Sequence, residues 1–191
     1  MAIETHVWKL KSRTPLKQNN PAETMTSGAD TGLTAGKKKY DDMDEATMRT
    51  YKDGDKFVHP TAAIRACLLA AAIGRKIGKR AAKGVVAGAV FPMELNMVIL
   101  DGKGKPHKKW VIDKCRVKVG QAGVIRCRPR WDEWSMEVPI EIDTDFVSAE
   151  HVTDLLNIAG RIIGIGDERP DTTNRRNGVG ICGRFTADLI S

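Results

Sequence analysis

The sequence predicts an α+β fold in which strands and two helices follow one another in the order β–α–β–β–β–α–β. Two observations support this prediction. Several stretches alternate between apolar and polar residues, and two others carry apolar residues at helical spacing. The chain has 191 residues, of which 41% are hydrophobic, and this is enough for a packed core. We therefore expect a single domain over residues 1–191, with a long loop inserted at about residues 12–55.

The first half of the chain is expected to supply one strand and one helix. The strand is "AIETHVWKLK", residues 2–11. The polar loop of residues 12–55 has no clear apolar period and allows only a short helix around residues 44–51; loops of this length tend to be functional or disordered. A helix follows in "HPTAAIRACLLAAAIG", with Pro60 at its first position. The basic segment "RKIGKRAAKG" comes next and is interrupted by glycines.

The second half is expected to supply the remaining strands and the other helix. Alternation predicts strands over residues 91–100 and 108–119, then a hairpin partner up to Arg130 and a further strand over residues 134–142. Pro139 indicates that the last of these lies at an edge or a bend. Ser148 is the expected cap of a helix that ends at Gly160, and a Gly-rich basic loop leads into a final strand over residues 181–190.

The hairpin carries its cations in a regular pattern. If residues 121–123 form a three-residue loop with Gly123 in the left-handed conformation, one register pairs both the apolar and the cationic residues. The cationic pairs are then Lys118 with Arg126, Arg116 with Arg128, and Lys114 with Arg130. Like charges on one sheet face repel one another, so this register predicts a face that holds phosphates.

Charge is distributed unevenly along the chain. The formal net charge is +7, yet residues 56–93 contain no acid, and residues 131–160 contain eight acids and no Lys or Arg. A cationic surface of this kind can hold a polyanion.

The four cysteines form no CxxC pair, which argues against a structural zinc site. The chain shows no signal peptide and no apolar run long enough for a bilayer, so we expect a cytoplasmic protein with no membrane partner.

Counting one hairpin as an extension, the element order is the βαββαβ plan of ferredoxin-like folds. RNA-recognition motifs use the sheet of that plan to carry nucleic acid. We therefore expect an RRM-like core with an antiparallel sheet, the long inserted loop and the basic β-hairpin.

Two segments resemble the RAMP superfamily, which includes the backbone subunits of CRISPR surveillance complexes. The first is "FVHPTAAIRACLLAA", which is similar to the family's entry into its first helix, and the second is "LLNIAGRIIGIGDERP…GVGICGRF", which is similar to its Gly-rich loop and last strand. The resemblance implies a binder of RNA or single-stranded DNA that assembles head to tail as a homo-oligomer along the strand. It also suggests other subunits of an RNA-guided complex as partners, in a prokaryotic cytoplasm, and a stand-alone phage or mobile-element member of the family.

The expected function is non-enzymatic, with no cofactor and no metal. The candidate nucleic-acid contacts lie on the hairpin, the basic segment after the first helix and the Gly-rich loop: Lys114, Arg116, Lys118, Arg126, Arg128, Arg130, Trp131, Lys76, Lys79, Arg80, Gly164, Gly166, Arg169, Arg175, Arg176 and Arg184. Arginine forks match phosphate oxygens, backbone amides of a Gly-rich loop can cradle phosphates, and Trp131 is the preferred residue to stack on a base.

Two alternatives remain open. The chain could be a protein-interaction factor of a phage or mobile element, for example a decoy subunit that acts on a host defence complex. It could also be a metal-dependent endoribonuclease, because some RAMP members cut RNA with an aspartate in the loop after the first strand. Asp30 lies in the corresponding loop, although no flanking motif supports it.

Overall fold

The computed structural model describes residues 2–21, 41–119, 122–171 and 180–191. Its strands are β1 (Ile3–Ser12), β2 (Leu16–Lys17), β3 (Lys52–Asp53), β4 (Lys56–Pro60), β5 (Lys76–Ile77), β6 (Arg80–Ala81), β7 (Val90–Pro92), β8 (Asn96–Val98), β9 (Val111–Val119), β10 (Ala122–Trp131), β11 (Ser135–Asp143) and β12 (Phe185–Leu189). The helices are α2 (Asp42–Met48), α3 (Ala62–Ala71), α4 (Ala82–Ala89) and α5 (Ala149–Ile162). The predicted α+β class with antiparallel sheets is confirmed.

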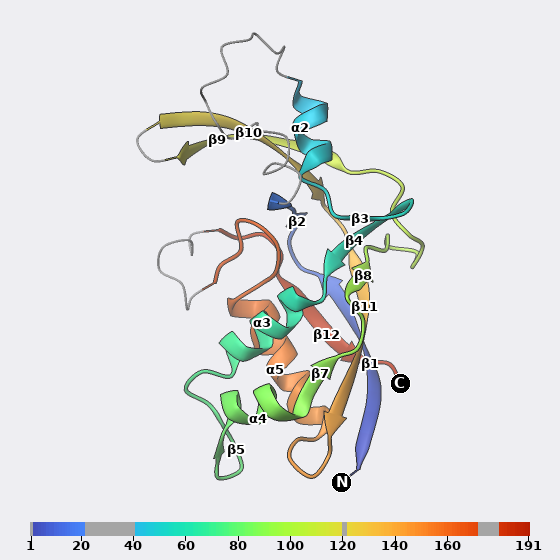
Figure 1. Ribbon diagram of the computed structural model, residues 1–191, viewed down its shortest axis with the longest axis vertical. Helices are drawn as coiled ribbons and strands as arrows, with labels where there is room; N and C mark the ends of the chain where they lie inside the picture. Colours follow the sequence, from blue (N-terminus) through green and yellow to red (C-terminus); the bar gives the residue numbers. More distant parts are fainter. Residues whose placement is uncertain (1, 22–40, 120–121, 172–179) are drawn as a thin grey trace.

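The core is a four-stranded sheet in the order β12–β1–β11–β7, and each neighbouring pair is antiparallel. Consequently β1 and β7 run parallel with β11 between them, and β11 and β12 run parallel with β1 between them. Helices α3, α4 and α5 lie together on one side of this sheet (Figure 1). The buried strand residues Trp8, Leu10 and Val138 pack against the helices through Leu68 and Leu156.

The helix predicted to follow Ser148 is confirmed in α5. The Ser148 side chain accepts a hydrogen bond from the His151 amide and caps the helix. The predicted end at Gly160 was wrong, because the helix continues to Ile162. Gly160 is a packing residue, because a Cβ there would lie 2.2 Å from the Phe185 carbonyl oxygen of β12.

Several predicted element bounds were wrong because neighbouring segments override the local pattern. Pro60 is the last residue of β4 and not the first of a helix; α3 begins at Ala62. The basic segment after α3 forms the β5–β6 hairpin and then α4, which buries Val85 and Val86 despite two glycines. The strand predicted over residues 91–100 is split, since β7 pairs with β11 and β8 pairs with β4.

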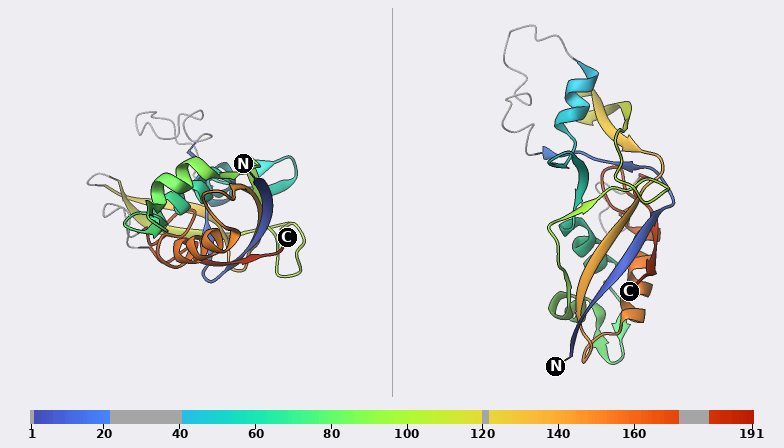
Figure 2. Two further views of the ribbon diagram at one scale, coloured as in Figure 1. Left: turned by 90° about the horizontal axis from the view of Figure 1, so that it is seen from below. Right: turned by 90° about the vertical axis from the view of Figure 1, so that its right-hand side faces the viewer.

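A second group of elements lies beyond one end of this core. Strands β9 and β10 form the predicted hairpin, β2 adds to it, and α2 packs beside it (Figures 1 and 2). The predicted 12–55 loop therefore contains β2, α2 and β3, while Asp30 lies outside the described residues. Among the helices that the structure describes, none has the length and apolar composition to cross a membrane.

The predicted hairpin register was wrong by three positions. Lys118 lies opposite Gly123, Cys115 opposite Arg126, and Asp113 opposite Arg128. Because side chains alternate between the faces of a sheet, an odd shift separates the cations. Arg126, Arg128 and Arg130 share one face, and Lys114 and Arg116 lie on the other. The observed register relieves the repulsion of the predicted one by placing a carboxylate opposite an arginine.

Candidate nucleic-acid interface

The hairpin cations are mostly engaged by carboxylates of the same chain. Arg128 is 8% exposed, and its guanidinium contacts Asp167 at 2.7 Å and Glu168 at 2.8 Å. The other pairs are Lys114 with Asp42, Arg126 with Glu45, and Arg130 with Asp113 and Asp132. Arg116 is exposed and has no ion pair within the described residues. The side chain of Lys118 lies outside them. The predicted phosphate track is therefore not assembled on one free face.

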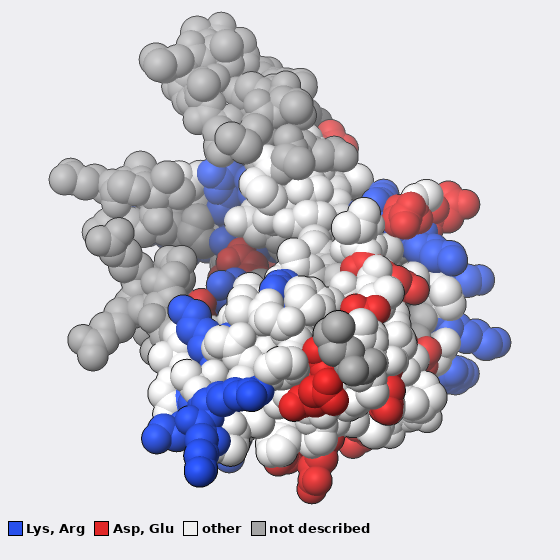
Figure 3. Space-filling model, turned by 60° about the horizontal axis from the view of Figure 1, so that its bottom comes forward, with Lys and Arg blue, Asp and Glu red and all other residues white. Residues whose placement is uncertain are grey.

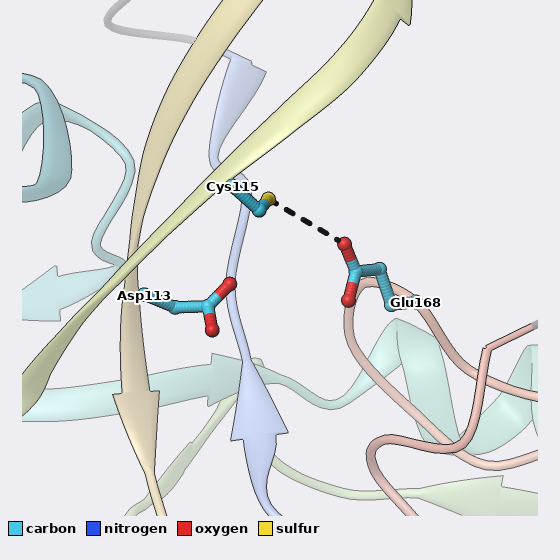
Figure 4. A group of neighbouring side chains, drawn as sticks. All are labelled: Asp113, Cys115 and Glu168. Atoms are coloured by element: carbon cyan, nitrogen blue, oxygen red, sulfur yellow. Dashed lines mark hydrogen bonds between the residues drawn. The ribbon is translucent and has the colours of Figure 1, made fainter.

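An ionic cluster joins the β9–β10 hairpin to the part of the chain between α5 and β12 that contains Gly164, Gly166 and Gly183, which we call the Gly-rich segment. Asp113 and Cys115 of β9 point towards Glu168 of that segment, and the three side chains have the spacing of metal ligands (Figure 4). The Lys17 ammonium contacts Asp113 at 2.9 Å and Glu168 at 2.6 Å. Arg128 contacts both Cys115 and Glu168. Two protein cations therefore neutralise this group already, and a metal ion would have to displace Lys17.

The same contacts set the ionisation of the cluster. Burial disfavours the charged form of Lys17, but its hydrogen bonds to Glu168 and Asp113 outweigh burial and raise its pKa. Burial likewise disfavours the Asp113 carboxylate, but Lys17 and Arg130 outweigh it and lower the Asp113 pKa. Both groups are therefore charged around neutral pH and hold the hairpin against the Gly-rich segment.

The sheet face opposite the helices does not have the charge of a phosphate platform. Its charged residues include Glu137, Glu141, Asp143 and Asp188, against Lys9 and Lys11. Lys9 pairs with Glu137, and Lys11 pairs with Asp188. Repulsion by these carboxylates would oppose a strand laid across this face in the manner of an RNA-recognition motif.

Trp131 is a core residue and cannot stack on a base in this conformation. It is 2% exposed, and its ring packs at 5.7 Å from that of Phe57. The prediction that Trp131 stacks on a base was therefore wrong, because Trp131, the last residue of β10, packs into the core.

The glycines of the Gly-rich segment are required by close packing. Gly166 has a φ of +77°, and a Cβ there would lie 2.4 Å from the Lys17 carbonyl oxygen. Gly164 also has a positive φ and lies against Gly183. The segment is thereby held between β2 and the approach to β12, where the Arg184 side chain donates to the Arg161 carbonyl. Arg175 and Arg176 lie outside the described residues.

A cavity of about 280 Å³ lies between this segment and the start of α3. Its lining includes Tyr51, His59, Ala63 and Arg169. Arg169 donates to the Gly166 carbonyl and to Asp171, and its other three N–H groups have no acceptor within the described residues. The carboxylate of Asp167 also lines the cavity but is engaged by Arg128 and by the Glu168 amide.

The hydrogen-bond network assigns the proton of His59 to Nε2. Gln18 accepts from the Tyr51 amide and donates to the Val58 carbonyl, which fixes the orientation of its side-chain amide. Its nitrogen also lies 3.2 Å from His59 Nδ1, so Nδ1 accepts a hydrogen bond. Burial and then the charge of Arg169 lower the pKa of His59 to about 4. The neutral ring therefore carries its proton on Nε2, which is buried without a partner in the described chain.

The N-terminus of α3 adds further donors beside the cavity. Its cap residue Thr61 makes no capping hydrogen bond, and its first turn contains no acid. Within the described residues the amides of Ala62 and Ala63 have no acceptor, and the buried Thr61 hydroxyl also lacks a partner. A helix N-terminus with free amides attracts anions. Of these residues only His59 and Ala63 line the cavity, and Arg169 is the lining side chain with N–H groups that an acceptor on an occupant could meet.

A second cationic surface lies at the other end of α3. Residues 75–83 carry Arg75, Lys76, Lys79, Arg80 and Lys83, all exposed and without an ion pair in the described residues. Arg80 lies 4.6 Å from the centre of the exposed Phe146 ring. Figure 3 shows Lys and Arg side chains gathered at its lower left, the side on which Figure 1 labels β5, apart from the acidic side chains in its centre. Lys76, Lys79 and Arg80 are therefore free for an anion.

Little in the sequence marks the cavity. His59 has a mainly structural reading from its place before Pro60, and nothing in the pattern marks Tyr51, Thr61 or Ala63. The available signal is the absence of an acid from the start of the α3 segment, which leaves its free amides uncompensated. Comparison with protein-family models and with curated proteins finds no match for this chain.

We predict that Asp113→Asn destabilises the fold at neutral pH by about 1–3 kcal/mol, because it leaves the Lys17 ammonium short of a partner. The lowered pKa of Asp113 means that its contribution is present above pH 4 and is lost as the pH falls through the folded-state pKa. Stability of the parent should therefore fall more steeply than that of the variant between about pH 5 and 3. Chemical denaturation across this range measures both slopes, and identical slopes would contradict the assignment.

Proposed function

We propose that this protein binds RNA or single-stranded DNA, without cutting it, at the donor-lined cavity and the cationic surface of residues 75–83. The cationic surface carries this proposal, because its Lys and Arg side chains are exposed without an ion pair in the described residues. Arg169 lines the cavity with N–H groups that can donate to phosphate oxygens, which are strong acceptors. Helix α3 joins the two sites over about 15 Å at 1.5 Å per residue. A single small anion cannot occupy both ends, whereas a strand with several phosphates can.

In this proposal the core is ferredoxin-like and RAMP-like. The arrangement that supports it is the pair of parallel strands β1 and β7, split by β11, together with the pair β11 and β12, split by β1. A Gly-rich segment precedes the last strand, as the resemblance implies. The protein would assemble head to tail on the strand, alone or with other subunits of an RNA-guided complex, and would leave sequence recognition to base pairing.

Exposed apolar residues favour a second candidate, the protein-interaction factor. Phe91, Met93 and Leu95 are 41%, 54% and 89% exposed and lie at or next to the edge strand β7. Such a surface is typical of a contact with another protein. Light scattering with and without an oligonucleotide separates the candidates: nucleic-acid-driven assembly supports strand binding, and a monomer insensitive to RNA supports the alternative.

We predict that Ala63→Asp weakens binding of a labelled oligo-U at least tenfold while the fold is retained. An acid in the first turn stabilises a helix by about 0.3–1 kcal/mol, but at this position it places a negative charge in the cavity. Ala62→Asp is the matched control, because Ala62 is exposed, does not line the cavity and lies one residue away. Fluorescence anisotropy measures binding and thermal unfolding checks the fold. If the Ala63→Asp variant binds as tightly as the parent, the cavity is not a binding site for the strand.

We further predict that replacing Lys76, Lys79, Arg80 and Lys83 together by Gln makes binding less dependent on salt. Each lost phosphate contact to a single strand should reduce the slope of log K against log salt by about 0.7. The control replaces Lys103, Lys105, Lys108 and Lys109 by Gln, which removes the same charge from another exposed segment. If both quadruple variants change the slope equally, only net charge matters and the surface is not a contact.

A further inference from the structure

A second cavity, of about 170 Å³, adjoins the first along α3. The two share Ala63, Gly166 and Arg169 in their linings. The second continues past Ala66 and Ala70 of the helix and past Ile163 to Gly166 of the Gly-rich segment. A group bound in the first cavity therefore has a neighbouring compartment into which part of the same ligand can extend.

The walls of the second cavity are small on both sides. On the helix, Ala63, Ala66 and Ala70 recur at spacings of three and four residues and present methyl groups along one face. On the other side, Gly164 and Gly166 have no side chains, and a Cβ at Gly166 would lie 2.4 Å from the Lys17 carbonyl oxygen. Alanine methyl groups and glycine backbone therefore form much of the lining of this compartment.

Polar groups are concentrated in one part of this compartment. Arg169 and Asp171 line it, and Arg169 still has unused N–H donors after its bonds to Gly166 and Asp171. The Cys67 thiol donates to the Gly164 carbonyl, so this sulfur is already satisfied. Burial is the largest influence on the thiol and raises its pKa to about 12, which leaves it protonated and chemically quiet.

We propose that the second cavity holds one nucleobase of the bound strand, with its flat faces against the alanine methyl groups and the glycine backbone and its edge towards Arg169. This inference rests on the proposed function, because the first cavity supplies the phosphate contact that anchors the nucleotide. Arginine donates most readily to carbonyl oxygens and ring nitrogens of a base edge.

The test compares two oligonucleotides of equal length and charge, one of deoxythymidines and one of abasic sites. The parent protein should bind the abasic strand about 5- to 150-fold more weakly, since base contacts of this kind contribute about 1–3 kcal/mol per base. Equal affinity for the two strands would overturn the base pocket and leave phosphate binding intact. Failure to bind either strand would overturn the proposed function and the base pocket together.

A substitution locates the effect. Ala66→Leu fills the second cavity from an exposed position on α3 and should remove the preference for the base-bearing strand, leaving affinity for the abasic strand at the parent value. Ala87→Leu on α4 is the matched control, because Ala87 is exposed and lines neither cavity. A preference that survives Ala66→Leu, or is lost equally in Ala87→Leu, would show that the base lies elsewhere.

Discussion

The arrangement of both cavities depends on the ionic contacts between the β9–β10 hairpin and the Gly-rich segment. Lys17, Arg128 and Arg130 pair with Asp113, Asp167 and Glu168 where the two parts of the chain meet. Partly buried charges are stable only when each has a close partner. These contacts consequently hold the segment in place, and Arg169, one residue after Glu168, is held at the border of both cavities.

The second constraint is the close backbone packing of the Gly-rich segment. Gly166 lies against β2, and Gly183 lies so close to Ile165 that a Cβ would fall 1.7 Å from its carbonyl oxygen. Glu168 and Asp171 adopt positive φ values without being glycine, a conformation that the surrounding contacts have to maintain. Glycine in this segment therefore serves packing first.

Charge in this protein has two separate uses. On the hairpin, arginines mainly satisfy carboxylates and connect the core to the outer elements, whereas residues 75–83 leave their cations in solvent. The sheet face that an RNA-recognition motif would use is rich in carboxylates. A strand bound by this protein would therefore follow the helical side, where donors and cations occur together.

Much of the fold follows from local pattern. Alternation predicted β1, the hairpin strands and β11, and the cap at Ser148 predicted α5, because these signals lie within a few residues of one another. The β5–β6 hairpin and α4 were missed, since glycines and a run of cations conceal a short buried face formed by Val85 and Val86. Of the predicted site residues, Lys76, Lys79, Arg80 and Arg116 are exposed without an ion pair in the described residues. Arg169 lines both cavities but is paired with Asp171, whereas Arg128 and Trp131 are buried.

By itself, the sequence determined the α+β class, the order of the main elements and the concentration of cations in two stretches. Only the tertiary structure decided the hairpin register, the ionic partners of its arginines and the donors left free around His59. The physical reason is that composition shows how many charges a segment carries but not which carboxylate lies opposite each one. A three-position shift in register was enough to turn a predicted binding face into an internal contact.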